Sequence, residues 1–254
     1  AGSGSDAEQF LDTAKPSVSA ARKSQKLTLK AASTKICVGK TTTVRASGAK
    51  QTSKYTYRSS DTKIATVNSA GKVTAKKVGK VKIIVTTPKT SKYKAGKKSI
   101  TIKVLPAATA SLKAANQKKG IKVTWKKVAG ATGYKVYRNN KLLTTVGKNA
   151  TVTYTDKTAT GNGTKYVYKV VAYAATGDST KSKSVPTCFL TAPSISSAKS
   201  TAKKQLTLKW KKNAKATGYE IQYSQKSSFA SAQTITVKKA ATVSWVIKKL
   251  TSGK

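Results

Sequence analysis

Side chains that could transfer protons are scarce in this sequence. Histidine, the residue most often used as a general acid or base, is absent, and the chain has only seven acidic residues. The acids beyond the N-terminal segment are scattered along the chain: Asp61, Asp156, Asp178 and Glu220. Two carboxylates across one cleft are therefore not expected, and we predict no catalytic residues.

The sequence also contains no motif for nucleophilic catalysis or for metal binding. Serine and threonine are plentiful, but a Ser-His-Asp triad cannot form without histidine. A Ser–Lys pair stays open in a chain with so much lysine, although no motif nominates one. Two cysteines without histidine are too few for a zinc site, and no glycine-rich phosphate loop precedes a helical pattern. We predict no metal site and no cofactor.

Positive charge is the one chemical property that this chain has in excess. It contains 51 Lys and Arg against 7 Asp and Glu, a formal net charge of +44. Lysine often alternates with Val, Ile or Leu, which is typical of the solvent face of a half-buried strand: Lys122, Lys135, Lys169 and Lys209. That explains single lysines but not the missing acids, and such repulsion disfavours compactness. We therefore predict a polyanionic surrounding: cell wall, mucin, anionic glycan or nucleic acid.

Specific recognition of nucleic acid is not predicted. Single-strand binders stack bases on exposed aromatic rings, whereas most rings here occupy expected core positions: Trp125, Tyr134, Tyr168, Trp210 and Tyr219. Tyr93 and Phe229 are better candidates for exposure, but two rings do not make a platform. Arginine, which suits bidentate readout, occurs only four times, at Arg22, Arg45, Arg58 and Arg138.

An internal repeat organises the second half of the chain. The segment Ile121–Lys127 is followed by Ala131-Thr132-Gly133-Tyr134, and Leu206–Lys212 is followed by Ala216-Thr217-Gly218-Tyr219. The Trp and Tyr of both copies are 85 residues apart, which indicates a repeated structural unit. Each copy contains two alternating strands around a short turn, and a unit of this length is typical of a small β-sandwich.

These patterns divide the chain into four segments. Residues 1–25, rich in Ala, Ser and Gly, are interpreted as a leader or linker. Residues 26–105 contain recurring strand patterns such as Val81–Val85, and residues 106–190 and 191–254 contain the two copies of the repeat. We predict an all-β fold of tandem β-sandwiches.

The segment 26–105 resembles a known bacterial family. Its motifs are Ser59-Ser60-Asp61, Ile64–Val67, Gly71–Ala75 and Val78-Gly79. They fall in register with the bacterial immunoglobulin-like domain, group 2, whose pattern runs Ser-Ser, Ala-Thr-Val, Gly-x-Val-Thr-Ala and a later Gly. The resemblance covers about 80 residues and implies a β-sandwich module.

The two repeats resemble the fibronectin type III domain. In residues 106–190 the resemblance is carried by Trp125, by Tyr134 to Tyr137 and by Tyr166–Tyr173, which is similar to the family's strand F pattern Tyr-x-Tyr-x-Val-x-Ala. The last segment is similar through Trp210, Gly218-Tyr219 and Trp245–Leu250. No Arg-Gly-Asp triplet occurs, so integrin binding is not implied. This order of domains resembles surface or secreted proteins of Gram-positive gut bacteria.

The segment 191–254 is expected to lack its last two strands. Adding the repeat length to Tyr168 leads to Gly253, so counterparts of Tyr166–Tyr173 and of the strand after it are missing. We expect either a truncated piece of a longer protein or a strand donor from another molecule that completes the third domain by β-augmentation.

Three further features bear on location. No run of about 18 apolar residues is present, so no transmembrane segment is expected. The sequence contains no methionine, so we expect that it begins as a processed or excised piece. Cys37 and Cys188 fall in different segments and are expected to be free thiols that are not joined to each other.

Together these features predict a non-catalytic, extracellular spacer and anchor array of a bacterial surface protein, associated with the cell wall. Its lysine-rich faces are expected to bind anionic cell-wall polymers, mucin or glycans by diffuse electrostatics. Two alternatives stay open: accessory modules of a secreted carbohydrate-active enzyme, and an adhesin that binds a host protein.

Overall fold

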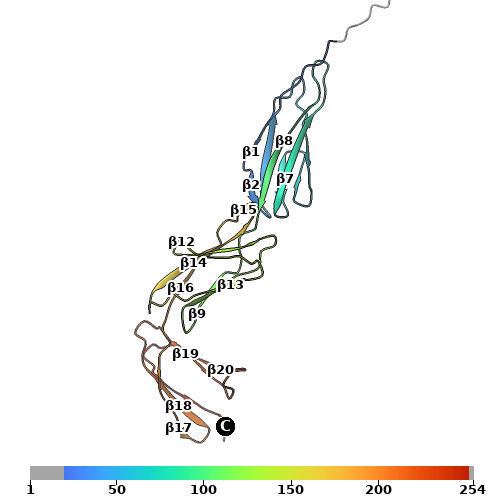
Figure 1. The fold of residues 1–254 in the computed structure, drawn as a ribbon. Coiled ribbons are helices and arrows are strands. Elements are labelled where there is room, and N and C mark those ends of the chain that lie inside the picture. The colour runs from blue at the N-terminus through green and yellow to red at the C-terminus, as the bar shows by residue number, and fades with distance from the viewer. Residues whose placement is uncertain (1–19, 252–254) are drawn as a thin grey trace, which may run out of the picture.

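The computed structural model describes residues 20–251, so most of the segment 1–25 lies outside the described residues. Every regular element in the described part is a β-strand, and the strands form three modules that follow one another along an elongated chain (Figure 1). The prediction of an all-β fold of tandem immunoglobulin-like sandwiches is confirmed.

The first module packs two four-stranded sheets face to face. One sheet has the order β1-β3-β6-β5, with the bounds Thr28–Ala31, Thr41–Ser47, Lys72–Ala75 and Ala65–Val67. The other has the order β2-β8-β7-β4, with the bounds Lys35–Cys37, Gly96–Leu105, Gly79–Thr87 and Thr56–Ser59. Strand β2 runs parallel to β8, and the other pairs are antiparallel.

Strict alternation along β7 and β8 forms the core of the first module. Val81, Ile83 and Val85 of β7 are buried between the sheets, as are Ile102 and Val104 of β8. The residues between them face outward, because successive side chains of a strand point to opposite faces. Alternating sequence therefore places one lysine-bearing face in water and one apolar face in the core.

The second module has a three-stranded and a five-stranded sheet. The smaller sheet has the order β13-β10-β9, with the bounds Thr153–Asp156, Ile121–Thr124 and Lys113–Asn116. The larger sheet has the order β12-β11-β14-β15, and β16 also pairs with β14. Its bounds are Lys141–Val146, Gly133–Arg138, Lys165–Ala174, Gly177–Asp178 and Val185–Cys188.

The third module repeats part of this plan. One sheet has the order β17-β18-β21, with the bounds Ile195–Ala202, Gln205–Trp210 and Ser244–Ile247. The other contains only β19 (Tyr219–Tyr223) and β20 (Gln233–Val237). No counterpart of β14 or β16 pairs with β19 within residues 20–251.

The 85-residue repeat is visible in side-chain geometry. Trp125 and Tyr134 of the second module pack edge to face with ring centroids 5.2 Å apart. Trp210 and Tyr219 of the third pack in the same way at 5.3 Å. The Tyr134 hydroxyl accepts the Val128 N–H, and the Tyr219 hydroxyl likewise accepts the N–H of Asn213.

The two repeats differ in how well their cores are covered. Ile121 and Val123 of β10 are fully buried, whereas their counterparts Leu206 and Leu208 of β18 are only partly buried. Trp245 of β21 remains 37% exposed. The described strands of the third module therefore leave apolar surface uncovered on the side where β14 packs in the second.

Hydrogen bonds join each module to the next. The Thr176 hydroxyl of the second module donates to the backbone carbonyl of Val104 at 2.9 Å. Asn162 and Asn213 exchange side-chain amide hydrogen bonds of 3.1 and 3.0 Å across the second junction. Cys37 is buried and Cys188 partly buried in different modules, and both are free thiols.

Candidate functional site

Three lysines form a straight row across the outer face of the β2-β8-β7-β4 sheet. Lys103 of β8 pairs directly with Lys35 of β2 on one side and with Lys80 of β7 on the other. Residues paired across strands project to the same face, and neighbouring strands are about 4.8 Å apart. We call Lys35, Lys103 and Lys80 the lysine row.

The lysine row follows from the way that the core is built. Val104 and Val81, the sequence neighbours of Lys103 and Lys80, are buried between the sheets, as is Ile36 beside Lys35. Their burial turns the lysines outward, where Lys35 and Lys80 are exposed and Lys103 is half-buried among neighbours. The register of β2 and β7 on β8 then aligns all three side chains.

Further cations extend this face. Lys82 of β7 lies two residues from Lys80 on the same side of the strand, and Lys97 projects from the other end of β8. Arg58 of β4 pairs with Ile84 and is exposed. Asp61 is the one acid in residues 20–105; it lies in the loop after β4 and accepts the N–H of Lys63. No ion pair forms within this described module.

The opposite sheet of the same module carries a sparser set of cations. Lys30 of β1 pairs with Arg45 of β3 on its outer face. Lys72 of β6 pairs with Thr43, which lies one step further along β3 on that face. All three cations are exposed, but they do not form one line across the strands.

In the second module, by contrast, some cations have carboxylate or aromatic partners. Lys135 of β11 forms an ion pair with Asp178 at 2.7 Å, and this hydrogen bond raises the pKa of Lys135 above its usual value. The same ammonium lies 5.7 Å from the ring centre of Tyr173. Lys181 lies 4.8 Å from the ring centre of Tyr137. The outer face of this sheet therefore mixes charge with rings and a carboxylate.

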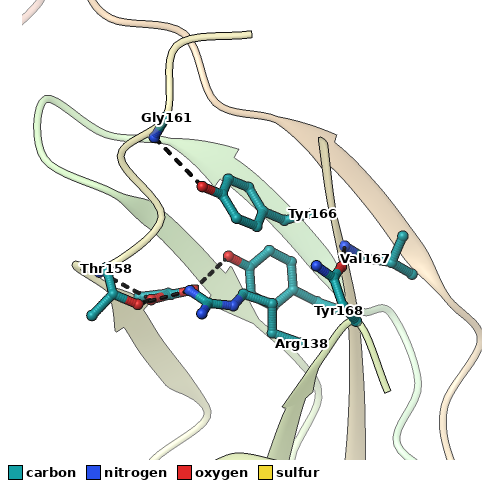
Figure 2. A network of polar contacts seen from close by, with 8 residues as sticks. Arg138, Thr158, Gly161, Tyr166, Val167 and Tyr168 are labelled. Carbon is teal, nitrogen blue, oxygen red and sulfur yellow. Dashed lines mark hydrogen bonds and ion pairs between the residues drawn. The ribbon is translucent and has the colours of Figure 1, made fainter. Parts of the chain in front are cut away.

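A buried polar network joins the two sheets of the second module (Figure 2). The Asp156 carboxylate at the end of β13 is fully buried and accepts hydrogen bonds from three side chains. The donors are the Tyr168 hydroxyl at 2.8 Å, an Arg138 guanidinium N–H at 3.0 Å and the Thr158 hydroxyl at 2.7 Å. The Thr158 N–H adds a fourth at 3.1 Å.

The electrostatics of this network stabilise one protonation state. Burial acts to raise the pKa of Asp156, but the hydrogen bonds from Thr158, Tyr168 and Arg138 outweigh it and hold this pKa below its ordinary value of 3.8. Burial beside the Asp156 carboxylate raises the pKa of Tyr168 far above its usual range. The carboxylate stays charged and the phenol neutral near pH 7, and both side chains are sealed from solvent. The network therefore acts as a structural clamp between the sheets.

The sequence-based expectations for single side chains can now be placed. Trp125, Tyr134, Tyr168 and Trp210 are buried as expected, and Tyr219 is partly buried. Phe229 is 54% exposed as predicted, whereas Tyr93 is half-buried because the segment around it pairs with Lys23. The acids Asp61, Asp156, Asp178 and Glu220 are not brought together in one place.

Sequence reasoning missed both the lysine row and the buried network. The one available signal for the network was the Tyr168 hydroxyl, because a buried tyrosine usually needs a polar partner. No such signal marks the lysine row, whose members are ordinary outward residues of three strands. Residues 20–251 contain no cluster of His, Cys, Asp and Glu suited to a metal ion. In that range no helix has the length and apolar character to cross a membrane.

The first module can be assigned by comparison. The family model of the bacterial Ig-like domain (group 2) matches residues 24–97. The matched residues include Lys35 and Lys80 of the lysine row, whereas Lys103 lies beyond them in the same module. None of the curated proteins matches the chain.

Several solved structures are similar to this chain at low identity. The FN1–FN3 domains of chicken CNTN1 are 15% identical, with 84% of this chain and 85% of that chain covered and a TM-score of 0.36. The spore cortex lytic enzyme SleM of Clostridium perfringens is 22% identical, with 34% and 29% covered and a TM-score of 0.29. Domains A168–A170 of titin are 14% identical, with 61% of each chain covered and a TM-score of 0.29.

The order of modules fits one broad role. Bacterial Ig-like domains, whose family model matches residues 24–97, are generally non-catalytic and are typical of extracellular or surface proteins. A module of this kind followed by two further β-sandwiches fits a surface or extracellular role.

Proposed function

We propose that this chain is a non-catalytic spacer and anchor array of a bacterial surface protein, held to anionic cell-wall polymers or glycans by its lysine-covered faces. The observation that carries the proposal is the charge arrangement of the bacterial Ig-like module. Its cations face each other across strands, one acid accompanies them in residues 20–105, and no ion pair forms there. Like charges placed opposite each other destabilise a sheet, and a polyanion removes that cost.

The broader architecture supports the same role. The three modules follow one another lengthwise, and hydrogen bonds connect them at both junctions. The polar group most like an active-site residue, Asp156, is fully buried and paired. A long array with outward cations is suited to spanning and adhering to a charged polymer layer.

Binding should be strongly salt-dependent, because release of counterions drives it. If about six cations engage a phosphate polymer, affinity should fall by at least roughly 10³-fold between 50 and 200 mM salt. The measurement is titration of the chain with teichoic acid, heparin and DNA over that range. Tight binding to one polymer that is insensitive to salt contradicts the proposal.

Two alternatives are separated by further measurements. An adhesin should retain a host protein in a pull-down at high salt, because specific docking survives screening better than charge attraction. Accessory modules of a carbohydrate-active enzyme should bind a neutral polysaccharide as well as an anionic one. If the chain retains neither a host protein nor a neutral polysaccharide at high salt, the result favours the anchoring function.

We also propose that the open edge of β19 binds an extended strand with alternating apolar residues, in the way that β14 binds β11. Tyr134, Val136 and Arg138 of β11 pair with Ala172, Val170 and Tyr168 of β14. The exposed side of Trp245 and the partly buried Leu206 and Leu208 mark the surface that such a strand would cover.

Hydrogen exchange tests this proposal and should show residues 191–251 far less protected than residues 106–190. Equal protection in a demonstrated monomer contradicts this proposal.

A further inference from the structure

The lysine row lowers the stability of its sheet, and the fold does not require lysine at these three positions. Lys35 and Lys80 each lie directly opposite Lys103, and each like-charge pair destabilises the sheet. The sequence offers a simple alternative, because Thr101 and Ser99 occupy the next outward positions of the same strand. Hydroxyl side chains are thus compatible with this face, and three aligned lysines are not needed for packing.

We propose that the outer face of the β2-β8-β7-β4 sheet is the principal docking face for a flexible phosphodiester polymer that carries no bases. The polymer lies across the strands, so that successive phosphates meet Lys35, Lys103 and Lys80. This inference rests on the proposed anchoring function and narrows it to one face and one polymer class.

The chemistry of the face is suited to phosphate. A lysine ammonium binds phosphate as a point charge, whereas the arginine fork makes bidentate contacts with carboxylate or phosphate, and Arg58 is the one arginine on this face. The hydroxyls of Ser99 and Thr101 lie on the same face of β8 and can donate to phosphate oxygens. The row thus offers charge with hydroxyl donors beside it.

The absence of rings on this face disfavours nucleic acid. Alternate residues of β2, β8, β7 and β4 project to this face, and they are Lys, Arg, Ser, Thr, Cys, Ile and Leu: 35 and 37; 97, 99, 101, 103 and 105; 80, 82, 84 and 86; 56 and 58. Tyr57 of β4 packs against the core instead. Bases would find no stacking partner, so a polymer with only a phosphate backbone fits better.

Geometry distinguishes this face from the opposite sheet of the same module. The lysine row continues over three neighbouring strands at a spacing of about 4.8 Å, and Lys82, Lys97 and Arg58 flank it. On the opposite sheet only Lys30 and Arg45 are direct neighbours, and Lys72 is displaced along the strand. A linear polyanion can engage more cations at once on the first face.

Two triple variants with equal charge test the proposal in the full chain. One is Lys35→Gln, Lys80→Gln and Lys103→Gln; the matched control is Lys30→Gln, Arg45→Gln and Lys72→Gln on the other sheet. Both remove three positive charges from the same module. The probe is poly(glycerol phosphate) at 50 mM salt, and a cooperative thermal transition that is no lower than that of the unaltered chain verifies the fold of each variant. The lysine-row variant should bind at least about tenfold more weakly than the control.

The outcomes separate this proposal from the broader one. Equal losses in both variants overturn the docking face but leave diffuse anchoring intact, whereas no binding by the unaltered chain overturns the anchoring function itself. Heparin and oligo(dT) serve as rival probes at the same salt concentration. A larger lysine-row effect on either rival than on poly(glycerol phosphate) overturns the assignment to a base-free phosphodiester polymer.

Discussion

The first and second modules are both two-sheet sandwiches, but they use charge in opposite ways. The second module seals the Asp156 carboxylate between its sheets with Arg138 and pairs Lys135 with Asp178 on its surface. The first module places its cations outside and pairs none of them within its described residues. Paired internal charge stabilises one module, and unpaired external charge makes the other responsive to its surroundings.

The difference shows that a high net charge does not determine what any single charge does. A buried carboxylate that accepts four hydrogen bonds is part of the architecture, and removing a partner leaves an unsatisfied group in the core. Exposed lysines in a row contribute little to folding or oppose it, which is why we propose a role in binding for them. Four measurements test this difference between the modules.

The largest effect is expected from Asp156→Asn in the second module. Asparagine keeps the shape but removes the charge that Arg138 and the Tyr168 hydroxyl face, so the free energy of unfolding of this module should fall by about 2–4 kcal/mol. Hydrogen exchange at increasing denaturant concentration, followed separately in residues 106–190 and in residues 26–105, measures the change in each module. Asp61→Asn, at an exposed turn of the first module, is the control and should change stability by less than about 0.5 kcal/mol. Equal losses of stability from Asp156→Asn and Asp61→Asn would contradict the proposed difference between the two modules.

Acid should destabilise the second module selectively. The pKa of Asp156 is held below its ordinary value in the folded state, so as pH falls below about 4 the unfolded chain takes up this proton first. The stabilisation is complete at pH 7 and is lost as pH falls through the folded pKa. Hydrogen exchange at pH 5 and pH 3, corrected for intrinsic rates, should show protection falling in residues 106–190 more than in residues 26–105. Asp156→Asn should abolish most of this difference.

Salt should act mainly on the first module. Screening weakens the repulsion along the lysine row, so raising salt from 50 to 500 mM should stabilise this module by roughly 1 kcal/mol. The buried Asp156 network is shielded from mobile ions and should respond less. Hydrogen exchange of β7 and β8 against that of β10 and β11 measures the difference. A larger gain in the second module would contradict the assignment of unpaired charge to the first.

The smallest effects come from neutralising one lysine in each module. Lys103→Gln removes both direct repulsions of the lysine row and should stabilise the first module by about 0.2–1 kcal/mol. Lys135→Gln breaks the exposed pair with Asp178 and should destabilise the second by at most about 0.5 kcal/mol. Thermal unfolding of each variant reports the sign. The same sign for both would show that the surface charges of the two modules behave alike.

Much of the fold was predictable from local patterns in the sequence. Alternation at Val81–Val85 and Ile121–Val123 is enough to predict strands with one buried face, because side chains of a strand alternate strictly. The repeated Trp and Tyr positions predicted two related modules, and the structure places Trp125 on Tyr134 and Trp210 on Tyr219 alike. The excess of lysine over acids pointed to a polyanionic partner, which stays a proposal.

The arrangement of charges was decided only by the tertiary structure. Lys35 and Lys103 become neighbours because β2 pairs in parallel with β8, and a slip of one residue in β2 would have turned Lys35 inward. Arg138, Asp156 and Tyr168 meet because two sheets pack face to face. Strand register and sheet packing depend on contacts between distant parts of the chain, which local alternation does not encode.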